Sequence, residues 1–171
     1  MNSTTSSTRW IFVVALLLLG LFSRFVPHWP NFTALGAVAL MGGSQLRPHW
    51  LAPLVTFGAL IISDLILGFY SGFSMVYLAF LMICIQGRWM NSSKGSHLFG
   101  HSLGASTLFF LLTNGAVWYA NPMYSQDVSG LILAYAAGLP FFLNFLLGTL
   151  AYGFGLSFVL RLVDRKVIQL S

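Results

Sequence analysis

The feature that most constrains this sequence is a series of apolar segments that recurs along its whole length. Hydrophobic residues make up 57% of its 171 residues, and only 6% are charged, whereas soluble domains carry about 25% charged residues. So few charges are too few to cover a soluble surface. Several of the segments are long enough to cross about 30 Å of hydrocarbon as a helix. The sequence therefore predicts an all-α membrane protein whose main partner is the lipid bilayer.

We expect one integral membrane domain over residues 9–166, with a disordered N-terminal tail at 1–8 and a C-terminal tail at 167–171. The fold class we predict is a bundle of six transmembrane helices. The expected crossings are residues 10–26, 32–46, 50–69, 73–90, 100–119 and 140–163.

An extra half-helix is expected before the last crossing. Residues 128–137 are apolar, but a segment of about ten residues is too short to span the membrane. Pro140 follows it, and a proline commonly ends or kinks a helix. We interpret the segment as a half-helix packed at the membrane edge.

Charge placement decides whether the short, Gly-rich and Ala-rich second segment crosses. Six crossings with a cytoplasmic N-terminus put nearly all basic residues on the cytoplasmic side and leave only Arg24 outside, which follows the positive-inside rule. If the second segment does not cross, this asymmetry disappears. The net charge of +5 thus reflects orientation, and the absence of a basic patch argues against nucleic acid as a partner. The residues expected in the cytoplasm, with both termini, are Arg9, Arg47, Arg88, Lys94, Arg161, Arg165 and Lys166.

Polar side chains within the apolar segments gather toward the outer side in this topology. Every segment contributes some of them, and the inner half of the bundle has few. We therefore predict a substrate-binding pocket that opens to the outer side. Its candidate residues are Arg24, His28, Asn31, Asp64, Tyr77, Asn114, Trp118, Tyr135 and Asn144.

Asp64 has two readings. A carboxylate at mid-bilayer costs about 2.5–3.5 kcal/mol, and such a residue faces the bundle interior beside a partner. Arg24 and His28 are the cations on the same side. Asp64 either contacts a ligand or gates the pocket, or it forms a structural ion pair that fixes the third helix to the connection after the first.

The other candidates also have structural alternatives. Asn114 and Asn144 can form hydrogen bonds between helices. Trp118 can belong to the aromatic belt at the membrane interface. Tyr77 and Tyr135 can stack on a ligand or simply pack in the core.

Two further features have mainly structural readings. Small and polar residues recur at helical spacing in the last helix, which favours close helix packing within the fold or docking of another subunit. Cys84, the single cysteine, reads as an inert buried thiol. The members of the small-residue stripe are Asn144, Gly148, Ala151 and Gly155.

Catalytic and metal-binding signatures are absent from the sequence. It contains no H-E-x-x-H, no Walker loop and no Gly-x-Ser-x-Gly. His97 and His101 lack a third ligand at a zinc-site spacing. We therefore expect neither an enzyme nor a cofactor.

The series of polar and Gly-rich segments resembles DUF6580, a family of bacterial inner-membrane proteins of unknown function. The resemblance covers nearly the whole chain after the first helix and implies the bacterial inner membrane as the location. The matching segments are residues 24–33, 37–43, 62–68, 76–77, 109–114 with Trp118, 130–131, and 138–142 with Asn144.

That family is similar to the S-components of energy-coupling-factor vitamin transporters, six-helix proteins that capture a vitamin from the outer side. Some relatives proposed to take up cobalamin bind cobalt through a pocket cysteine, and Cys84 is the one candidate for that role here. The alanines four apart that dock the coupling subunit in S-components are missing from the first helix. Partnership with an energising module therefore stays open.

The resemblance implies uptake or binding of a vitamin-like small molecule at the outer face. The alternative is a structural membrane scaffold, like the cell-shape proteins with a similar helix architecture, which would have protein partners and no ligand.

Overall fold

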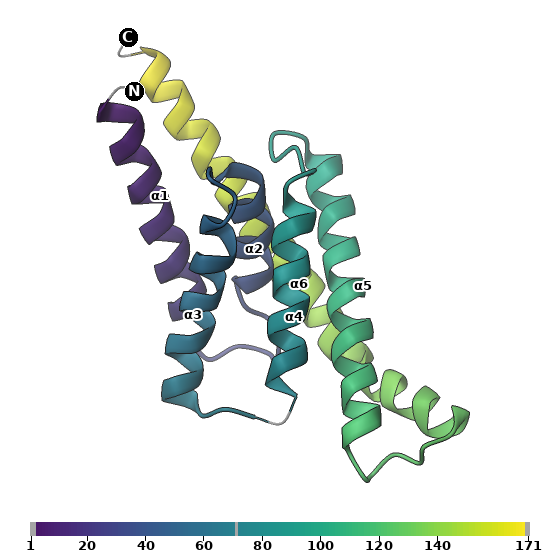
Figure 1. Ribbon diagram of the computed structural model, residues 1–171. Coiled ribbons are helices and arrows are strands. Elements are labelled where there is room, and N and C mark those ends of the chain that lie inside the picture. The colour runs from purple at the N-terminus through teal and green to yellow at the C-terminus, as the bar shows by residue number, and fades with distance from the viewer. Residues whose placement is uncertain (1–2, 71, 170–171) are drawn as a thin grey trace.

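Six helices and no strand make up the part of the chain that the computed structural model describes, residues 3–70 and 72–169, with side chains described for 9–70 and 72–163. The expected all-α class is confirmed. The helices alternate in direction, and both termini lie at one end of the molecule (Figure 1). The helices are α1 (Ser3–Phe22), α2 (Leu35–Gln45), α3 (Leu51–Leu67), α4 (Phe73–Gly87), α5 (Gly95–Ala120) and α6 (Val128–Gln169).

The ends of the chain are more helical than expected. Residues 3–8, predicted to be disordered, continue the helical backbone of α1, and α6 runs on to Gln169. Residues 1–2 and 170–171 of the two predicted tails lie outside the described residues. Conversely, α2 begins only at Leu35, because the two prolines that follow α1 keep the connection nonhelical up to residue 34.

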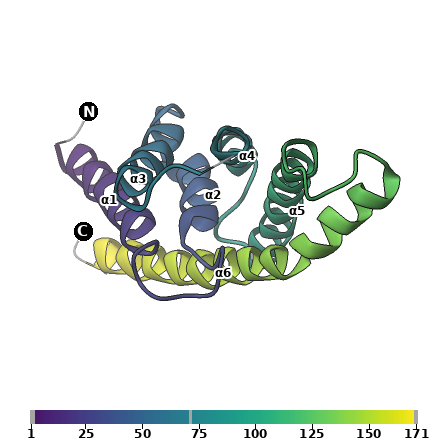
Figure 2. The same cartoon turned by 90° about the horizontal axis from the view of Figure 1, so that it is seen from below.

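The predicted half-helix is not a separate element. Residues 128–137 and residues 140–163, predicted as the last crossing, belong to one helix, α6, with Pro140 inside it. A proline inside a helix removes one backbone hydrogen bond and bends the axis, but packing on both sides can hold the helix together. Figure 2 shows α6 changing direction in its green part while its yellow part runs along the bundle. Pro140 therefore bends the helix instead of ending it.

The short helix α2 occupies the centre of the bundle. It contacts each of the other five helices, and every residue from Leu35 to Gly43 is buried. Its 11 residues span roughly 16 Å at 1.5 Å per residue. Its longer neighbours extend past it, as Figure 1 shows, so α2 fills only part of the height of the bundle.

Two glycines let α2 and α4 approach at backbone distance. A Cβ at Gly43 would collide with the carbonyl oxygen of Cys84, and a Cβ at Gly87 would collide with the carbonyl oxygen of Leu40. A Cβ at Gly87 would also lie 3.1 Å from the Cα of Gly43. Any side chain at either position would push the helices apart, so this contact sets the position of the central helix.

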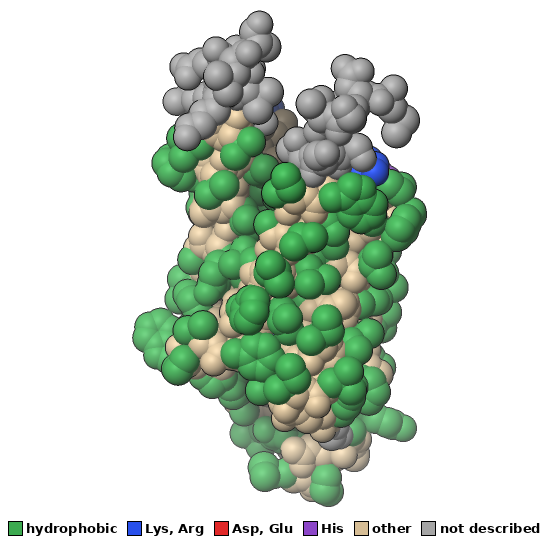
Figure 3. Space-filling view, turned by 90° about the vertical axis from the view of Figure 1, so that its left-hand side faces the viewer, with side chains coloured by type: hydrophobic (Ala, Val, Ile, Leu, Met, Phe, Trp, Pro, Cys, Tyr) green, Lys and Arg blue, Asp and Glu red, His purple; other side chains and the backbone are tan. Residues whose placement is uncertain are grey.

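The surface of the bundle is largely apolar. Two helical segments, Gly95–Ala120 and Val128–Val163, are long and apolar enough to cross a membrane, and Leu51–Leu67 and Phe73–Gly87 are shorter apolar helices. Large hydrophobic side chains on all of them are exposed. Hydrophobic atoms cover the face drawn in Figure 3, where a basic side chain shows only near the upper end.

Basic residues concentrate at the end that carries both termini, which we call the terminal end; the opposite, distal end holds the connections 23–34, 68–72 and 121–127. At the terminal end, the guanidinium of Arg161 donates to the carbonyl of Ser93 at 2.9 Å. Arg24 is the one Lys or Arg at the distal end within the described side chains. The basic residues of the terminal end are Arg9, Arg47, Arg88, Lys94 and Arg161.

Asp127 sits directly before α6 and caps its first turn. Its Oδ1 accepts hydrogen bonds from the backbone N–H of Gly130 and from the hydroxyls of Ser125 and Ser129, each at 2.8 Å. These bonds, the one from Gly130 first, lower the pKa of Asp127 from its usual 3.8 to about 2. A carboxylate in this position satisfies an otherwise unpaired N–H group and favours the start of the helix.

Gly87→Ala should destabilise the protein, because the new methyl group forces α4 away from α2. Overpacking of this kind costs about 1–3 kcal/mol. Thermal unfolding of the purified protein measures the loss. The matched control is Gly155→Ala on α6, where a Cβ meets nothing within 4 Å; its stability should stay level or rise. Equal stability of the two variants would contradict the close α2–α4 contact.

Asp127→Asn should remove one acid-sensitive contribution to stability. Because the pKa of Asp127 falls to about 2 on folding, its contribution is complete above a pH of about 4. It is lost as the pH falls toward 2. The melting temperature of the wild type should therefore drop more steeply over that range than that of Asp127→Asn. Parallel curves would show that the carboxylate is not stabilised by the cap.

Candidate functional site

The connection between α1 and α2 forms a tight arch at the distal end. The Ser23 hydroxyl donates to the carbonyl of Gly20 and accepts the N–H of Ala34 at 3.1 Å, which ties the end of α1 to the start of α2. Asn31 has a left-handed φ of 65°, a conformation that asparagine adopts more readily than most residues. The Asn144 amide on α6 donates to the carbonyl of Pro30 at 3.0 Å. The arch is thus fixed to α6 as well as to its own ends.

A buried ion pair fixes the arch to α3. Nη1 of Arg24 lies 2.6 Å from Oδ1 of Asp64, with the two side chains 15% and 0% exposed. The same nitrogen donates to the hydroxyl of Ser63 and to the carbonyl of Leu60. The hydroxyl of Tyr77 on α4 donates to Oδ2 of Asp64 at 2.9 Å. Both carboxylate oxygens are therefore satisfied, as a buried charge requires.

A cavity of about 520 Å³ lies at the distal end. Leu35, the first residue of α2, lines it on the side that faces the terminal end, which we call its floor. This volume is within the range of about 300–1,000 Å³ that small-molecule sites occupy. Its walls come from the arch, from α3 to α6, and from the other two distal connections. The cavity exists because α2 begins only at Leu35 and leaves the distal part of the bundle axis unfilled. The polar residues that line it are Arg24, His28, Asn31, Thr33, Tyr70, Thr113, Asn114 and Tyr124.

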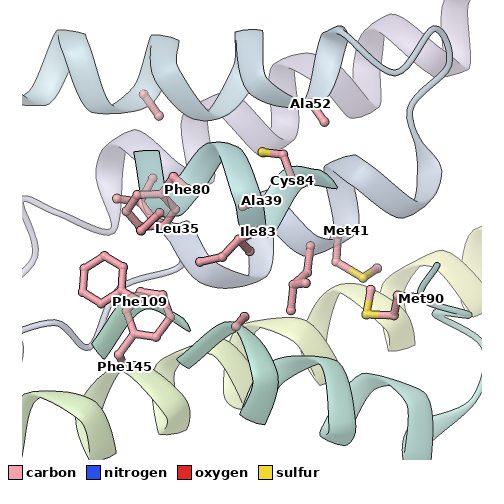
Figure 4. Close-up of a cluster of buried hydrophobic side chains, with 14 of the residues drawn as sticks. Leu35, Ala39, Met41, Ala52, Phe80, Ile83, Cys84, Met90, Phe109 and Phe145 are labelled. Atoms are coloured by element: carbon pink, nitrogen blue, oxygen red, sulfur yellow. The ribbon is translucent and has the colours of Figure 1, made fainter. Parts of the chain in front are cut away.

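Three phenylalanines from different helices form the floor of the cavity. Phe109 of α5 and Phe145 of α6 stack with ring centroids 4.4 Å apart and planes 9° from parallel. Phe80 of α4 lies 5.4 Å from Phe109. Figure 4 shows the three rings gathered beside Leu35, while Met41 and Met90 fill the opposite side of the same cluster. The floor is therefore aromatic and continuous with the hydrophobic core.

The nine predicted site residues divide into two groups. Arg24, His28, Asn31 and Asn114 line the cavity. The other five do not: Asp64, Tyr77, Trp118, Tyr135 and Asn144.

Those five residues instead hold the walls together. Asp64 and Tyr77 lie behind Arg24 and bond to it or to each other. The indole of Trp118 donates to the carbonyl of Ser125, and the hydroxyl of Tyr135 donates to the carbonyl of Leu111 on α5 at 2.9 Å. Their side chains bridge elements that border the cavity.

Asn114 lines the cavity at a close contact between α5 and α6. Its amide nitrogen donates to the carbonyl of Phe110 at 2.9 Å, and a Cβ at Gly138 would collide with its side chain. A glycine is needed at 138 for the amide to fit between the two helices. Asn114 therefore does not form the expected hydrogen bond between helices, because its bond stays within α5; it packs against Gly138 and borders the cavity.

Sequence reasoning missed the aromatic floor. Phe80, Phe109 and Phe145 look like ordinary core residues in apolar helices, and their side chains are almost fully buried. Thr33, Thr113 and Tyr124 were also not among the predicted site residues, although they line the cavity. The sequence offered one signal for these three polar residues, which is that they lie near the distal ends of apolar segments.

Cys84 lies in the core and not in the cavity. Its thiol is 3.4 Å from the hydroxyl of Thr56 on α3, and the residue is 2% exposed. Among the described residues no group of three potential metal ligands comes together. Cys84 therefore does not lie where the resemblance implies a cobalt-binding cysteine, because it is not among the residues that line the cavity.

The small-residue stripe of α6 packs within the fold over half its length. Gly148 meets the backbone of Thr33, which a Cβ would approach to 3.0 Å. Further along α6, Ala151 is exposed and a Cβ at Gly155 would meet nothing within 4 Å. The first half of the stripe therefore explains how α6 approaches the arch.

Comparison with protein families gives one match, to the model described as "Family of unknown function (DUF6580)", over residues 4–170. Neither the curated proteins nor the solved structures gave a match.

The double substitution of the ion pair should destabilise the protein less than the sum of the losses from the two single substitutions. Arg24→Met leaves a fully buried carboxylate unpaired, which costs about 3–5 kcal/mol, and Asp64→Asn should cost about 3 kcal/mol. Arg24→Met/Asp64→Asn should lose clearly less than the sum, because neither charge is stranded. Unfolding of the four proteins measures the coupling, with Tyr77→Phe as a milder control. Additive losses would mean that the two side chains are not energetically coupled.

Proposed function

Since the chain belongs to the DUF6580 family, whose description names no activity, we propose its function from its own geometry. We propose that it is a multi-pass protein of the bacterial inner membrane, with six crossings, that captures a small molecule from the side opposite its termini. The single observation that carries the proposal is the cavity at the distal end of an apolar bundle.

Aromatic residues at both ends support insertion in a bilayer. Trp10, Trp50 and Trp89 are exposed near the terminal end, and Trp29 and Tyr119 are exposed near the distal end. Such belts mark the two interfaces of a membrane. The apolar side chains exposed between them match hydrocarbon, which is the environment that such a surface requires.

Five helices present an apolar outer face to the lipid, and α2 crosses the membrane at the centre of the bundle, surrounded by the other five. Because α2 is buried on all sides, its short length does not expose backbone or loops to hydrocarbon, where unpaired polar groups are not tolerated. Irregular backbone at membrane depth is acceptable when protein surrounds it. The arch before α2 lies at the distal end, where residues 25–30 are exposed, and the bonds of Ser23 and Asn144 hold it against the helices.

The distribution of charge supports a cytoplasmic terminal end. Five described basic residues lie at that end, and the one at the distal end is neutralised by Asp64. The positive-inside rule assigns the end richer in Lys and Arg to the cytoplasm. The cavity would then open to the outer side.

The cavity favours a binding protein over a scaffold. A scaffold without ligand needs no hollow, and interiors without function are packed nearly to crystal density. A hollow of about 520 Å³ with an aromatic floor and a polar mouth is the form that small-molecule sites take. This arrangement suits an S-component type of protein, in which rocking of the bundle would bring the captured molecule to the inner side.

Thiol labelling tests both orientation and access. An impermeant maleimide added outside spheroplasts should label Ala137→Cys, because position 137 lines the cavity and is exposed. It should not label Asn91→Cys, which lies at the terminal end, until the membrane is made permeable. The wild type is the control, since its one thiol at Cys84 is buried.

Labelling of Asn91→Cys from outside, or a C-terminal reporter found on the outer face, would reverse the orientation. An Ala137→Cys thiol that stays unlabelled from outside while it reacts after unfolding would mean that the cavity is closed. Either result would contradict capture from the outer side.

A further inference from the structure

The hydrogen-bonding groups and the apolar surface of the cavity lie on different walls. Arg24, Asn31 and Thr33 belong to the arch, while Phe80, Phe109 and Phe145 come from α4, α5 and α6. The remaining polar groups from α5 are partly used within the helix: Thr113 donates to the carbonyl of Phe109 and Asn114 donates to that of Phe110. Tyr70 and Tyr124 add hydroxyl groups from the other two distal connections. The arch is the wall that combines a charged donor with a side-chain amide, Arg24 and Asn31, so it is the wall best suited to recognise a polar group of a ligand.

Arg24 offers free donors to the cavity but little free charge. All its hydrogen bonds within the described protein use Nη1, so Nε and Nη2 have no protein partner there. Its charge, however, is balanced by Asp64 at 2.6 Å, on a side chain that is 0% exposed. The guanidinium can donate a hydrogen bond to a ligand while it remains paired.

A negatively charged ligand would disturb this balance. It would either take Arg24 from Asp64, leaving a carboxylate stranded at a fully buried position, or share Arg24 and place two negative charges beside one positive charge. Both arrangements are unfavourable where water is scarce. A positively charged ligand finds no carboxylate among the lining residues, because Asp64 lies behind Arg24.

The floor selects the shape of the rest of the molecule. Phe109 and Phe145 stack on each other with their planes 9° apart, and Phe80 is tilted by 59° and 51° to them, so the floor is a cluster of aromatic rings at different angles. Flat aromatic groups gain from offset-stacked or edge-to-face contacts with such rings, beyond the burial of area alone. A volume of about 520 Å³ accommodates fused rings together with a polar substituent.

From these observations, and on the basis of the proposed function, we infer that the cavity takes an uncharged, planar aromatic molecule bearing a carbonyl-type acceptor. The acceptor faces the arch and bonds to Arg24 and Asn31, and the ring system lies against Phe109 and Phe145. The Arg24–Asp64 pair acts as a filter that excludes carboxylates of the same shape.

Three probes of equal shape and different charge test the inference: 2-naphthamide, 2-naphthoate and 2-naphthylmethylammonium. Each is added to the full-length Ala137→Cys variant in detergent, and the slowing of maleimide labelling gives its affinity. Naphthamide should protect the thiol at a concentration at least about tenfold lower than either charged probe. The same titration followed by naphthalene fluorescence provides a readout independent of the thiol.

Substitutions then separate the filter from the hydrogen bond. In the Ala137→Cys background, Asp64→Asn removes the balancing charge, so naphthoate should gain at least about tenfold relative to naphthamide. Asn31→Gly, which removes the amide and keeps the left-handed φ accessible, should weaken naphthamide about fivefold to tenfold without a gain for naphthoate. Asn91→Ala at the terminal end is the matched control and should change neither affinity.

Preference for naphthoate or for the ammonium probe in the wild-type background would overturn the inference while leaving small-molecule capture intact. Protection by none of the three probes would also overturn it. In that case the labelling of Ala137→Cys from the outer side still tests small-molecule capture separately. If Asp64→Asn does not fold, the preference of the Ala137→Cys variant, which keeps the Arg24–Asp64 pair, among the three probes still tests the inference.

Discussion

Everything at the distal end depends on how tightly the central helix α2 is held. Glycines at 43 and 87 bring α2 and α4 into backbone contact, and the remaining faces of α2 are buried by the other four helices. A helix of 11 residues cannot fill a bundle whose other members are longer. The part of the bundle axis that α2 does not fill is the cavity. The short length of α2 therefore sets the depth at which the cavity ends.

The ion pair of Arg24 and Asp64 then determines the character of that hollow. It ties the arch to α3, and Tyr77 extends the network to α4. One of its members faces the cavity and the other is fully buried. Of the two readings of Asp64, the structure shows the structural pair, and Asp64 does not line the cavity. The proposed filter assigns this carboxylate an indirect role, through the charge of Arg24.

Some parts of the site could be predicted from the sequence, and others could not. Arg24 and His28 were the two expected partners of Asp64 because cations are scarce on that side, and the pair forms with Arg24. Tyr135 and Trp118 were placed at the right end, but their hydroxyl and indole groups bond to backbone carbonyls instead of lining the hollow. Such details depend on the rotation of each helix about its axis, which spacing in an apolar helix without a polar face does not reveal.

The sequence by itself determined the all-α class, the approximate positions of most helices and the concentration of basic residues at one end, because these follow from composition and from the order of apolar and polar segments. Only the tertiary structure decided that Pro140 bends α6 instead of ending it and that Phe80, Phe109 and Phe145 meet beneath the cavity. The physical reason is that both results depend on packing between residues far apart in the chain. Hydropathy measures how well each residue tolerates burial, but not which neighbour buries it.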